Sequence, residues 1–397
     1  MTAGGFRLMM ACLVGVHLPA FSGSVLGQSP GLPDGEAAAF EATRPAPESD
    51  QSSPGGLRGD SRWAEWQRMT GDWARLRSRL DTAGVHLSSW SVSDVSGAAG
   101  SGARSGSAVA QGVLDVDATF DLEKLAGLPG ASVFVQYFGN VGADGSESLE
   151  AYQAYSNIDA DRFHRVGELW YEQWLAGRRL RVKVGRVDAN SEFARVENAS
   201  EFINASMGYS PTISALPTYP SPAWSANVFV YPTSHLYVGV GAYSRRTGDG
   251  DGDEDDVRAA LRAFLIGEAG VRRTWPGQRL RGRLGIGAWY EPATWQALDG
   301  SPAHFPAAPF VAFDHDLWRG PSGEEDDDVA GFGVTAIRFS PLCSTRSGRE
   351  TAFGPFYKWQ ATGWLEVKPD LQFVRNAGGT RGGSYSIAAT LRLRVEM

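Results

Sequence analysis

Cysteine is scarce in this sequence, and its scarcity limits the possible folds. Only two of the 397 residues are cysteines. Cys12 lies in an N-terminal segment that has the features of a cleavable signal, which leaves Cys343 alone in the mature chain. A single cysteine cannot form an intrachain disulfide, so the sequence excludes a disulfide-stapled fold.

Long apolar runs and a basic excess are also missing. Beyond residues 1–27, no stretch approaches the roughly 18 uninterrupted apolar residues of a membrane-spanning helix. Only helices and closed barrels satisfy every backbone polar group in lipid, so a membrane form of this chain must be a barrel. Lys and Arg number 37 against 45 Asp and Glu, which gives a formal net charge of -8. This balance argues against a nucleic-acid-binding protein, which normally carries a clustered basic excess.

The N-terminal part divides into three segments. Residues 1–27 are typical of a secretory signal peptide, because Arg7 precedes an apolar run and compact residues lie before Gln28. We therefore expect the mature chain to leave the cytoplasm. Residues 28–60 combine proline with Ser, Gly and acidic residues, which predicts a disordered linker. In residues 61–84, apolar side chains recur at spacings of three and four, which predicts a short amphipathic helix.

Residues 85–397 form the main domain, and their pattern is typical of a β-barrel. Short segments of alternating polarity follow one another without a further amphipathic helix of convincing length. The predicted fold class is all-β: a transmembrane antiparallel β-barrel preceded by the short helix. Fourteen candidate strands can be placed, at residues 86–95, 110–122, 131–140, 165–176, 179–187, 224–231, 235–243, 258–270, 279–290, 307–316, 329–340, 352–361, 364–374 and 384–396.

The connections between these strands alternate in length. Short connections alternate with long loops, except that the connection 317–328 falls on the short side. Outer-membrane barrels have this asymmetry, with the short turns facing the periplasm. An even number of strands would also place both termini in the periplasm.

The last strand separates a polar face from an apolar face. A lumen and a lipid phase would explain this separation, although a water-soluble sandwich shows the same alternation. The loop asymmetry favours the barrel. The polar face carries Arg392, Arg394 and Glu396, and the apolar face carries Tyr385, Ile387, Ala389, Leu391, Leu393, Val395 and Met397.

Residues 165–187 are predicted to form a hairpin with a two-residue turn at Gly177-Arg178. The turn fixes the register. On one face, Trp would meet Arg in cation–π contacts, Glu would meet Lys, and a Trp would cover a glycine. That face pairs Ala176 with Arg179, Trp174 with Arg181, Glu172 with Lys183, Trp170 with Gly185, and Glu168 with Val187. The other face is mostly apolar and pairs Leu175 with Leu180, Gln173 with Val182, Tyr171 with Val184, and Leu169 with Arg186.

Two functions fit the polar face of this hairpin. It could be an ordinary polar barrel wall, or a sugar-binding surface on which aromatic rings stack against sugars while charged groups bind hydroxyls. Arg186 belongs to the apolar face by parity, and a bulge near Gly185 would turn it inward. The loop 188–223 is long enough for folding into the pore to be one plausible use of it. The candidate pore-lining residues are Glu168, Trp170, Glu172, Trp174, Arg181, Lys183, Arg186, Asp188, Arg279, Arg281 and Arg283.

No motif in the sequence indicates catalysis or a metal site. Aspartates alternate between Asp249 and Asp256, but an EF-hand also needs a flanking helix and a glutamate at its twelfth position, so a solvated acidic loop is favoured. The six histidines show no metal-ligand spacing. Since no nucleophile with an adjacent base is recognisable, we predict neither an enzyme nor a bound cofactor.

Five motifs follow one another along the chain from about Thr70 to the C-terminus. They are Thr70-Gly71-Asp72-Trp73 with Arg77, Arg79, Leu80 and Ala83-Gly84-Val85; Asp121 to Leu125 with Gly130-Ala131; Glu168-Leu169-Trp170 with Glu172-Gln173; Gly185-Arg186 with Asp188 and Phe193; and Lys368 to Val374 with Asn376, Gly378 and Gly379. In this order they resemble the carbohydrate-selective porins of the OprB family. The sequence departs from that family at Ala74-Arg75, where Gly-Gly is usual, and at Met397, where an aromatic residue is usual.

The resemblance implies a sixteen-stranded outer-membrane barrel through which monosaccharides diffuse past charged residues that narrow the pore. Two strands would then be hidden in the long loops. The partners implied are small sugars, outer-membrane lipid and the barrel assembly machinery, while the oligomeric state stays open. Two alternatives are a secreted β-rich carbohydrate-binding protein, or an enzyme on such a scaffold, and an anion-selective porin, which rows of arginine would suit.

Overall fold

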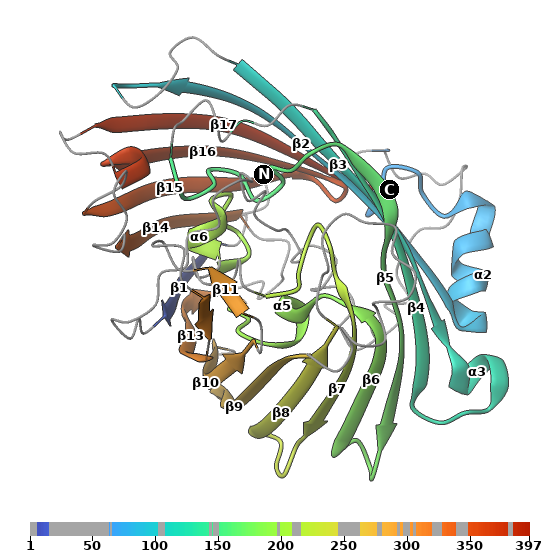
Figure 1. Ribbon diagram of the computed structural model, residues 1–397. Coiled ribbons are helices and arrows are strands. Elements are labelled where there is room, and N and C mark those ends of the chain that lie inside the picture. The colour runs from blue at the N-terminus through green and yellow to red at the C-terminus, as the bar shows by residue number, and fades with distance from the viewer. Residues whose placement is uncertain are drawn as a thin grey trace.

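The computed structural model describes a barrel that surrounds two short helices. In Figure 1, the sheet curves around an interior that holds α5 (Ala189–Glu192) and α6 (Ala205–Gly208). Among the described residues, no helix has both the length and the apolar character needed to cross a membrane. The structure describes residues 6–15, 63, 66–101, 108–142, 145, 151–196, 199–208, 216–244, 263–275, 280–291, 294–296, 302–304, 307–319, 328–338, 348–379 and 384–397.

Fourteen strands of the barrel correspond to the fourteen predicted ones. Each overlaps its candidate, with the largest displacement in the eighth, which begins at Phe264 rather than near residue 258. The antiparallel barrel that the alternation predicted is thus confirmed. The strands are β2 (Val85–Ala99), β3 (Ala108–Asp121), β4 (Ala131–Gly142), β5 (Phe163–Leu175), β6 (Leu180–Val187), β7 (Ala223–Val230), β8 (Leu236–Tyr243), β9 (Phe264–Trp275), β10 (Leu280–Tyr290), β13 (Ala307–Arg319), β14 (Asp328–Arg338), β15 (Arg349–Thr362), β16 (Leu365–Arg375) and β17 (Tyr385–Glu396).

A further strand, β1 (Phe6–Gly15), lies in the segment predicted to be a signal peptide. It closes the barrel between β13 and β14, antiparallel to the first and parallel to the second. Cleavage after Gly27 stays a prediction; it would remove β1 and leave the fourteen antiparallel strands. Two short strands, β11 (Thr294–Gln296) and β12 (Pro302–His304), pair only with each other. Within the described residues, the long loops therefore add no strand to the barrel.

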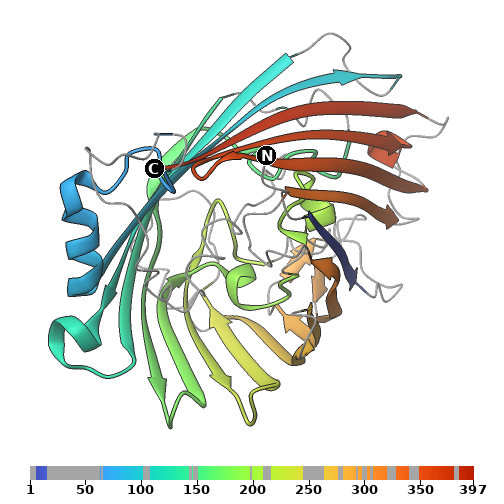
Figure 2. The ribbon, with the colours of Figure 1, turned by 180° about the vertical axis from the view of Figure 1, so that it is seen from behind.

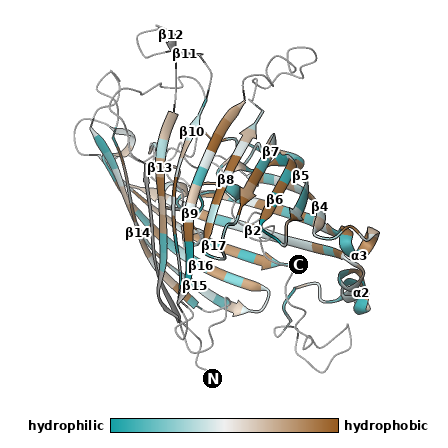
Figure 3. Cartoon of the chain, turned by 90° about the horizontal axis from the view of Figure 1, so that it is seen from below, coloured by the Kyte–Doolittle hydropathy of each residue, from teal (hydrophilic) through white to brown (hydrophobic). Residues whose placement is uncertain are grey.

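Alternation along the strands places apolar side chains outside and polar ones inside. Figure 3 shows hydrophilic and hydrophobic residues following one another along the strands. In β17, Leu391 and Leu393 are exposed while Thr390 and Arg392 are buried, as the sequence predicted. Because the side-chain period of a strand is two, this assigns the odd-numbered face of β17 to the lipid side.

The N-terminal arm outside the barrel is less helical than predicted. Its α-helix, α2 (Leu76–Ala83), begins only after Trp73, Ala74 and Arg75, whose φ angles of 47°, 58° and 70° are left-handed. Such angles cost little for glycine and roughly 1–2 kcal/mol for other residues, so the chain keeps the turn at Ala74-Arg75 without the usual glycines. Figure 2 shows α2 beside the outer wall, near α3 (Leu122–Ala126). The Arg77 guanidinium fastens this arm to the end of the chain by donating to the Met397 carbonyl at 3.1 Å.

Candidate pore constriction

The β5–β6 hairpin has the register predicted from its sequence. Trp174 pairs with Arg181, Glu172 with Lys183, and Trp170 with Gly185. These side chains face the interior, where Trp170, Glu172, Arg181 and Lys183 are buried. The ladder ends at Leu175 and Leu180, so the outermost predicted pair belongs to the turn instead.

The turn of this hairpin is longer than predicted. It covers four residues, and the Arg179 N–H donates to the Leu175 carbonyl at 3.1 Å. Three successive residues have positive φ: Ala176 at 51°, Gly177 at 63° and Arg178 at 64°. The register is unchanged because the two additional turn residues, Ala176 and Arg179, come one from each strand.

The bulge lies in β5 rather than near Gly185, so the prediction for Arg186 is wrong. The β4–β5 register shifts between Val135 and Tyr137, whereas the ladders on both sides of β6 are regular. Arg186 therefore stays on the outward face, opposite Leu169 and Trp224. Its guanidinium donates to the carbonyls of Val166 and Pro222 at 3.1 and 2.9 Å. The shift in β5 instead leaves both Gly167 and Glu168 inside.

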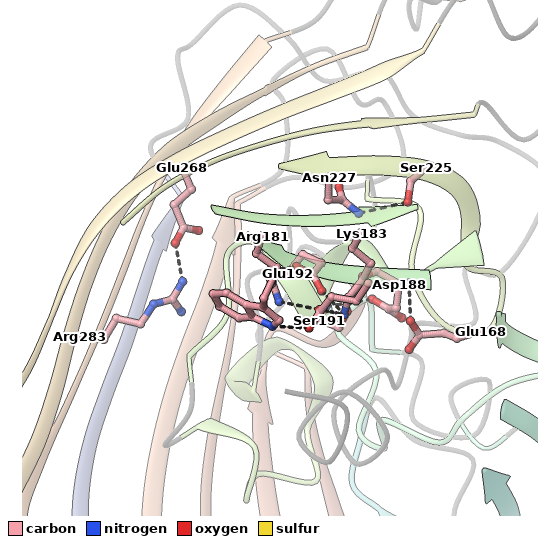
Figure 4. A network of polar contacts seen from close by, with 12 residues as sticks. Glu168, Arg181, Lys183, Asp188, Ser191, Glu192, Ser225, Asn227, Glu268 and Arg283 are labelled. Carbon is pink, nitrogen blue, oxygen red and sulfur yellow. Dashed lines mark hydrogen bonds and ion pairs between the residues drawn. The ribbon is translucent and has the colours of Figure 1, made fainter. Parts of the chain in front are cut away.

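Of the three arginines predicted near the start of β10, the structure describes two, which lie in different surroundings. Arg283 is buried, and its guanidinium is ion-paired with the Glu268 carboxylate of β9 (Figure 4). Arg281 is exposed near the end of the strand. Arg279 lies outside the described residues, as do the aspartates from Asp249 to Asp256. Among the described residues of β10, the structure therefore gives one buried arginine from this predicted set, Arg283, and the carboxylate of Glu268 balances its charge.

A carboxylate from the loop after β6 joins the two cations of the hairpin. The Glu192 side chain, which has no exposed surface, forms ion pairs with Arg181 and with Lys183, the latter at 2.7 Å. Glu172 lies 3.4 Å from both cations. Figure 4 shows this cluster where α5 approaches β6. We call the contact of Glu192 with Arg181 and Lys183 the buried anchor.

The aromatic and acidic neighbours complete the buried anchor. The Lys183 ammonium lies 3.9 Å from the centroid of the Trp170 ring, whose other neighbour is the Phe134 ring at 4.9 Å. Asp188 caps α5, and its carboxylate accepts from the Tyr219 N–H at 2.8 Å and from the Thr218 hydroxyl. Its own N–H donates to Glu168 at 3.2 Å. Trp170 is thus covered on both sides by protein.

The charges around Glu192 determine its protonation. Burial alone would raise the pKa of Glu192, but the adjacent Arg181 and Lys183 outweigh burial and lower this pKa to about 2. Asp188 differs, because burial raises its pKa and its hydrogen bonds offset only part of that effect. Glu192 is therefore a permanent anion at any pH near neutrality.

A second carboxylate anchors the same loop on the opposite side of the barrel. Glu201 accepts from Lys358 of β15 at 2.7 Å and from Lys368 of β16 at 2.8 Å. In the strand order of the barrel, β15 and β16 lie far from β6 in either direction. We call the contact of Glu201 with Lys358 and Lys368 the exposed anchor, because the Glu201 side chain is 21% exposed.

Between the two anchors, the loop follows the inside of the wall strand by strand. We call residues 188–196 and 199–208 the long inserted segment. Its contacts confirm that part of the 188–223 loop folds into the barrel. Its contacts run from Asp188 at β5 and Glu192 at β6 through Phe193 at Phe229 of β7 and Tyr243 of β8, Ala194 at Glu268 of β9, Arg195 at Arg283 of β10, and Val196 and Ala199 at Ala312 of β13, to Glu201 at β15 and Asn204 at Gln372 of β16.

The loop between β4 and β5 covers the rest of the wall in the same manner. We call residues 151–160 the short inserted segment. It joins the long one through the Asn157 N–H, which donates to the Ile203 carbonyl at 2.8 Å. Its wall contacts are Gln153 with Thr335 of β14 and Glu350 of β15, Tyr155 with Gln372 of β16, Asn157 with Arg392 of β17, Ser156 with Asp94 of β2, Asp159 with Gln111 of β3, and Ile158 with Asn140 of β4.

Together, the two inserted segments form an inner collar that touches all fourteen antiparallel strands. The strand residues predicted to line the pore, such as Trp170 and Lys183, lie behind this collar and are nearly inaccessible. The collar itself presents the more accessible groups, among them Tyr152, Arg195, Glu201 and Phe202. A solute inside the barrel therefore meets the collar at this level rather than the strand wall.

Comparison with known proteins identifies the family. The model of the carbohydrate-selective porin, OprB family, matches residues 106–308 and 319–397, which is well over half of the chain. The chain belongs to the OprB family. It is accordingly a carbohydrate-selective porin of the outer membrane, and its barrel is a channel.

One solved structure of an OprB porin shares the fold, and two further matches are weaker. The high-pH structure of OprB from Pseudomonas putida is 19% identical, with a TM-score of 0.73, and the match covers 85% of this chain and 100% of that one. The low-pH structure of the same protein is 18% identical, with a TM-score of 0.49, covering 84% and 99%. A loop-deletion variant of OmpT, an outer-membrane protein of Vibrio cholerae, is 9% identical, with a TM-score of 0.42, covering 78% and 99%. A search of curated proteins found no match.

Several residues of this OprB-family collar were missed by reasoning from the sequence. Glu192 and Glu201 lie in a loop, where no periodicity assigns a side chain to a face. The inward lysines Lys358 and Lys368 did carry a signal, because strand alternation places both on the buried face of their strands. Two inward lysines on neighbouring strands, with Glu366 beside only one of them, could have indicated that a loop carboxylate approaches the pair.

Proposed function

We propose that small neutral sugars, above all monosaccharides, diffuse through the barrel along a path that the inner collar narrows. The observation that supports this proposal is the charge balance where the collar meets the strand wall. Arg181 and Lys183 meet Glu172 and Glu192, and Arg283 meets Glu268. These paired groups are buried and add no net charge beside the path, and a neutral solute needs no counter-charge.

Seven of the eleven candidate residues take one of two roles in this proposal. Trp170, Glu172, Arg181 and Lys183, with Glu168 and Asp188, hold the collar in place from behind. Trp174, which is half-buried near the short turn, is the aromatic residue of the hairpin that a sugar could stack upon. Arg186 on the outer face has no role in the pore.

Swelling of liposomes that contain the purified porin tests the proposal. We expect rapid swelling in glucose, slow swelling in a tetrasaccharide of the same osmolarity, and partial block of ion current by glucose in planar bilayers. The anion-selective alternative predicts a strongly anion-selective reversal potential and no effect of glucose on current. Equal swelling rates in the two sugars would overturn size selection by the collar.

Maturation and assembly complete the proposed function. The precursor would be cleaved after Gly27, the linker 28–60 would lie in the periplasm, and the barrel assembly machinery would recognise β17. Met397 continues the lipid-facing parity of Leu393, so Met397→Phe should maintain or improve the yield of heat-modifiable barrel on a denaturing gel. A lower yield would count against this recognition. We expect the protein to pass sugars unchanged, without catalysis or a cofactor.

A further inference from the structure

The exposed anchor has a second feature besides joining the collar to the wall. Lys358 and Lys368 project inward from neighbouring strands, and their side chains are only 8% and 6% exposed. The Glu201 side chain above them is 21% exposed, and its two carboxylate oxygens contact one ammonium group each. Glu201 therefore lies between the lysine pair and the interior of the barrel.

The neighbouring groups do not replace Glu201 in this position. Glu366, on the same strand as Lys368, lies 3.2 Å from that ammonium group. Glu201 is the carboxylate that the structure places against both lysines, and its backbone carbonyl also accepts from Lys368 at 3.2 Å. Phe202, beside it, packs edge-on against Phe356, with ring centroids 5.0 Å apart. This aromatic contact fixes the backbone that carries the carboxylate.

The charge of Glu201 is permanent. Burial would raise its pKa, but Lys358 and Lys368 outweigh burial and hold the pKa of Glu201 well below its usual value. Protonation at ordinary pH therefore cannot uncover the lysines. Without Glu201, the two ammonium groups would face only Glu366. The remaining positive charge would concentrate anions there, because low-dielectric walls focus the field of unbalanced charges.

We propose that Glu201 is a specificity-determining residue: together with Glu366 it neutralises the Lys358–Lys368 pair, and so keeps the pore permeable to neutral solutes instead of anions. The site beneath it is a latent anion site, with the chemistry to bind inorganic phosphate or a carboxylate. This inference rests on the proposed sugar path, since selectivity at Glu201 matters only if solutes pass the collar.

The experiment compares Glu201→Gln with wild type in planar bilayers under a potassium chloride gradient. Glu201→Gln should shift the reversal potential toward chloride and raise the chloride-to-potassium permeability ratio by about tenfold, the lower range of electrostatic focusing. Inorganic phosphate should also reduce the current of Glu201→Gln more than that of wild type. An unchanged reversal potential would overturn the proposal.

Two further variants separate charge from loop position. Asn204→Ala removes a hydrogen bond of 2.8 Å between the same segment and Gln372 without changing charge, so it should leave the reversal potential as in wild type. Glu201→Gln/Lys368→Gln lowers the positive charge again and should return the reversal potential toward the wild-type value. A shift in Asn204→Ala as large as in Glu201→Gln, or no return in the double variant, would contradict charge masking.

A converse variant covers the case in which Glu201→Gln fails to assemble. Lys358→Gln/Lys368→Gln leaves Glu201 without its two ammonium partners and should shift the reversal potential toward potassium; no shift would again overturn the proposal. Glucose-driven swelling of wild-type liposomes tests the sugar path separately. If wild type passes glucose but Glu201 variants show wild-type reversal potentials, only this inference fails; if wild type passes no glucose, the proposed function itself fails.

Discussion

The two anchors of the long inserted segment use the same chemistry at different depths. In each, one loop carboxylate contacts two cations from the barrel wall. The Glu192 side chain is 0% exposed, whereas the Glu201 side chain is 21% exposed. Removing a partner from a fully desolvated ion cluster leaves buried charge uncompensated, while water can solvate a partly exposed one. The comparison indicates that the buried anchor holds the collar and that the exposed anchor sets the charge that solutes meet.

Neutralising the buried anchor should produce the largest effect. Glu192→Gln leaves Arg181 and Lys183 buried without this carboxylate, which should destabilise the seated collar by roughly 3–5 kcal/mol. Hydrogen exchange of the backbone amides in residues 189–208 measures this loss of protection. The matched variant Glu201→Gln should cost only about 1 kcal/mol, since partly exposed pairs contribute little. Equal losses in the two variants would remove the distinction between the anchors.

Acid should weaken the buried anchor only well below neutrality. The pKa of Glu192 is about 2 in the folded protein against 4.5 ordinarily. A lowered pKa means that the ionised group contributes stability above pH 4.5 and loses it as the pH falls toward 2, by roughly 3 kcal/mol in total. Hydrogen exchange, corrected for intrinsic rates, should show a seated collar at pH 5 to 7 and progressive opening between about pH 4.5 and 2. Glu192→Gln should lack this pH dependence, and its persistence would assign the transition to another group.

Adding a side chain at Gly185, in the hairpin that carries Arg181 and Lys183, should lower the stability of the protein. A Cβ atom there would lie 2.3 Å from the Leu169 carbonyl oxygen and 2.6 Å from the Trp170 Cα, at a φ of +137°. Gly185→Ala should therefore cost roughly 1–3 kcal/mol in denaturant unfolding. Gly177→Ala, with a φ of +63° and open space around the Cβ, should cost about 1 kcal/mol. A larger effect at Gly177 would show that the turn, not the contact with Trp170, limits the hairpin.

The smallest effect is expected on the outer face of the same strand. Tyr171→Ala should leave collar protection and glucose-dependent conductance unchanged, because Tyr171 faces away from Lys183 and Glu192. Trp170→Ala should loosen the collar, since it removes the ring that contacts Lys183 and Phe134. Similar conductance changes in the two variants would mean that the buried anchor does not govern passage.

The local sequence pattern was sufficient to predict the strands that form the barrel wall, but it was insufficient to predict the segments that fill the interior. The alternation of β17 and the Trp174–Arg181 and Glu172–Lys183 pairs follow from a period of two and one turn, so they could be read from neighbouring residues. The bulge at Gly167 and Glu168 could not, because it depends on how β5 pairs with β4. Glu192 and Glu201 were missed because their partners are defined by three-dimensional contact: Glu201 and Lys368 are 167 residues apart.

The central claim is that the inner collar excludes large solutes and that Glu192 and Glu201 hold it in place. Replacing both carboxylates at once tests this claim most directly. The measurement is liposome swelling in glucose and in a tetrasaccharide, for wild type and for Glu192→Gln/Glu201→Gln, at matched amounts of heat-modifiable barrel. Both proteins should pass glucose, and only the double variant should pass the tetrasaccharide at a comparable rate. A double variant that still excludes the tetrasaccharide as wild type does would contradict the role assigned to the collar.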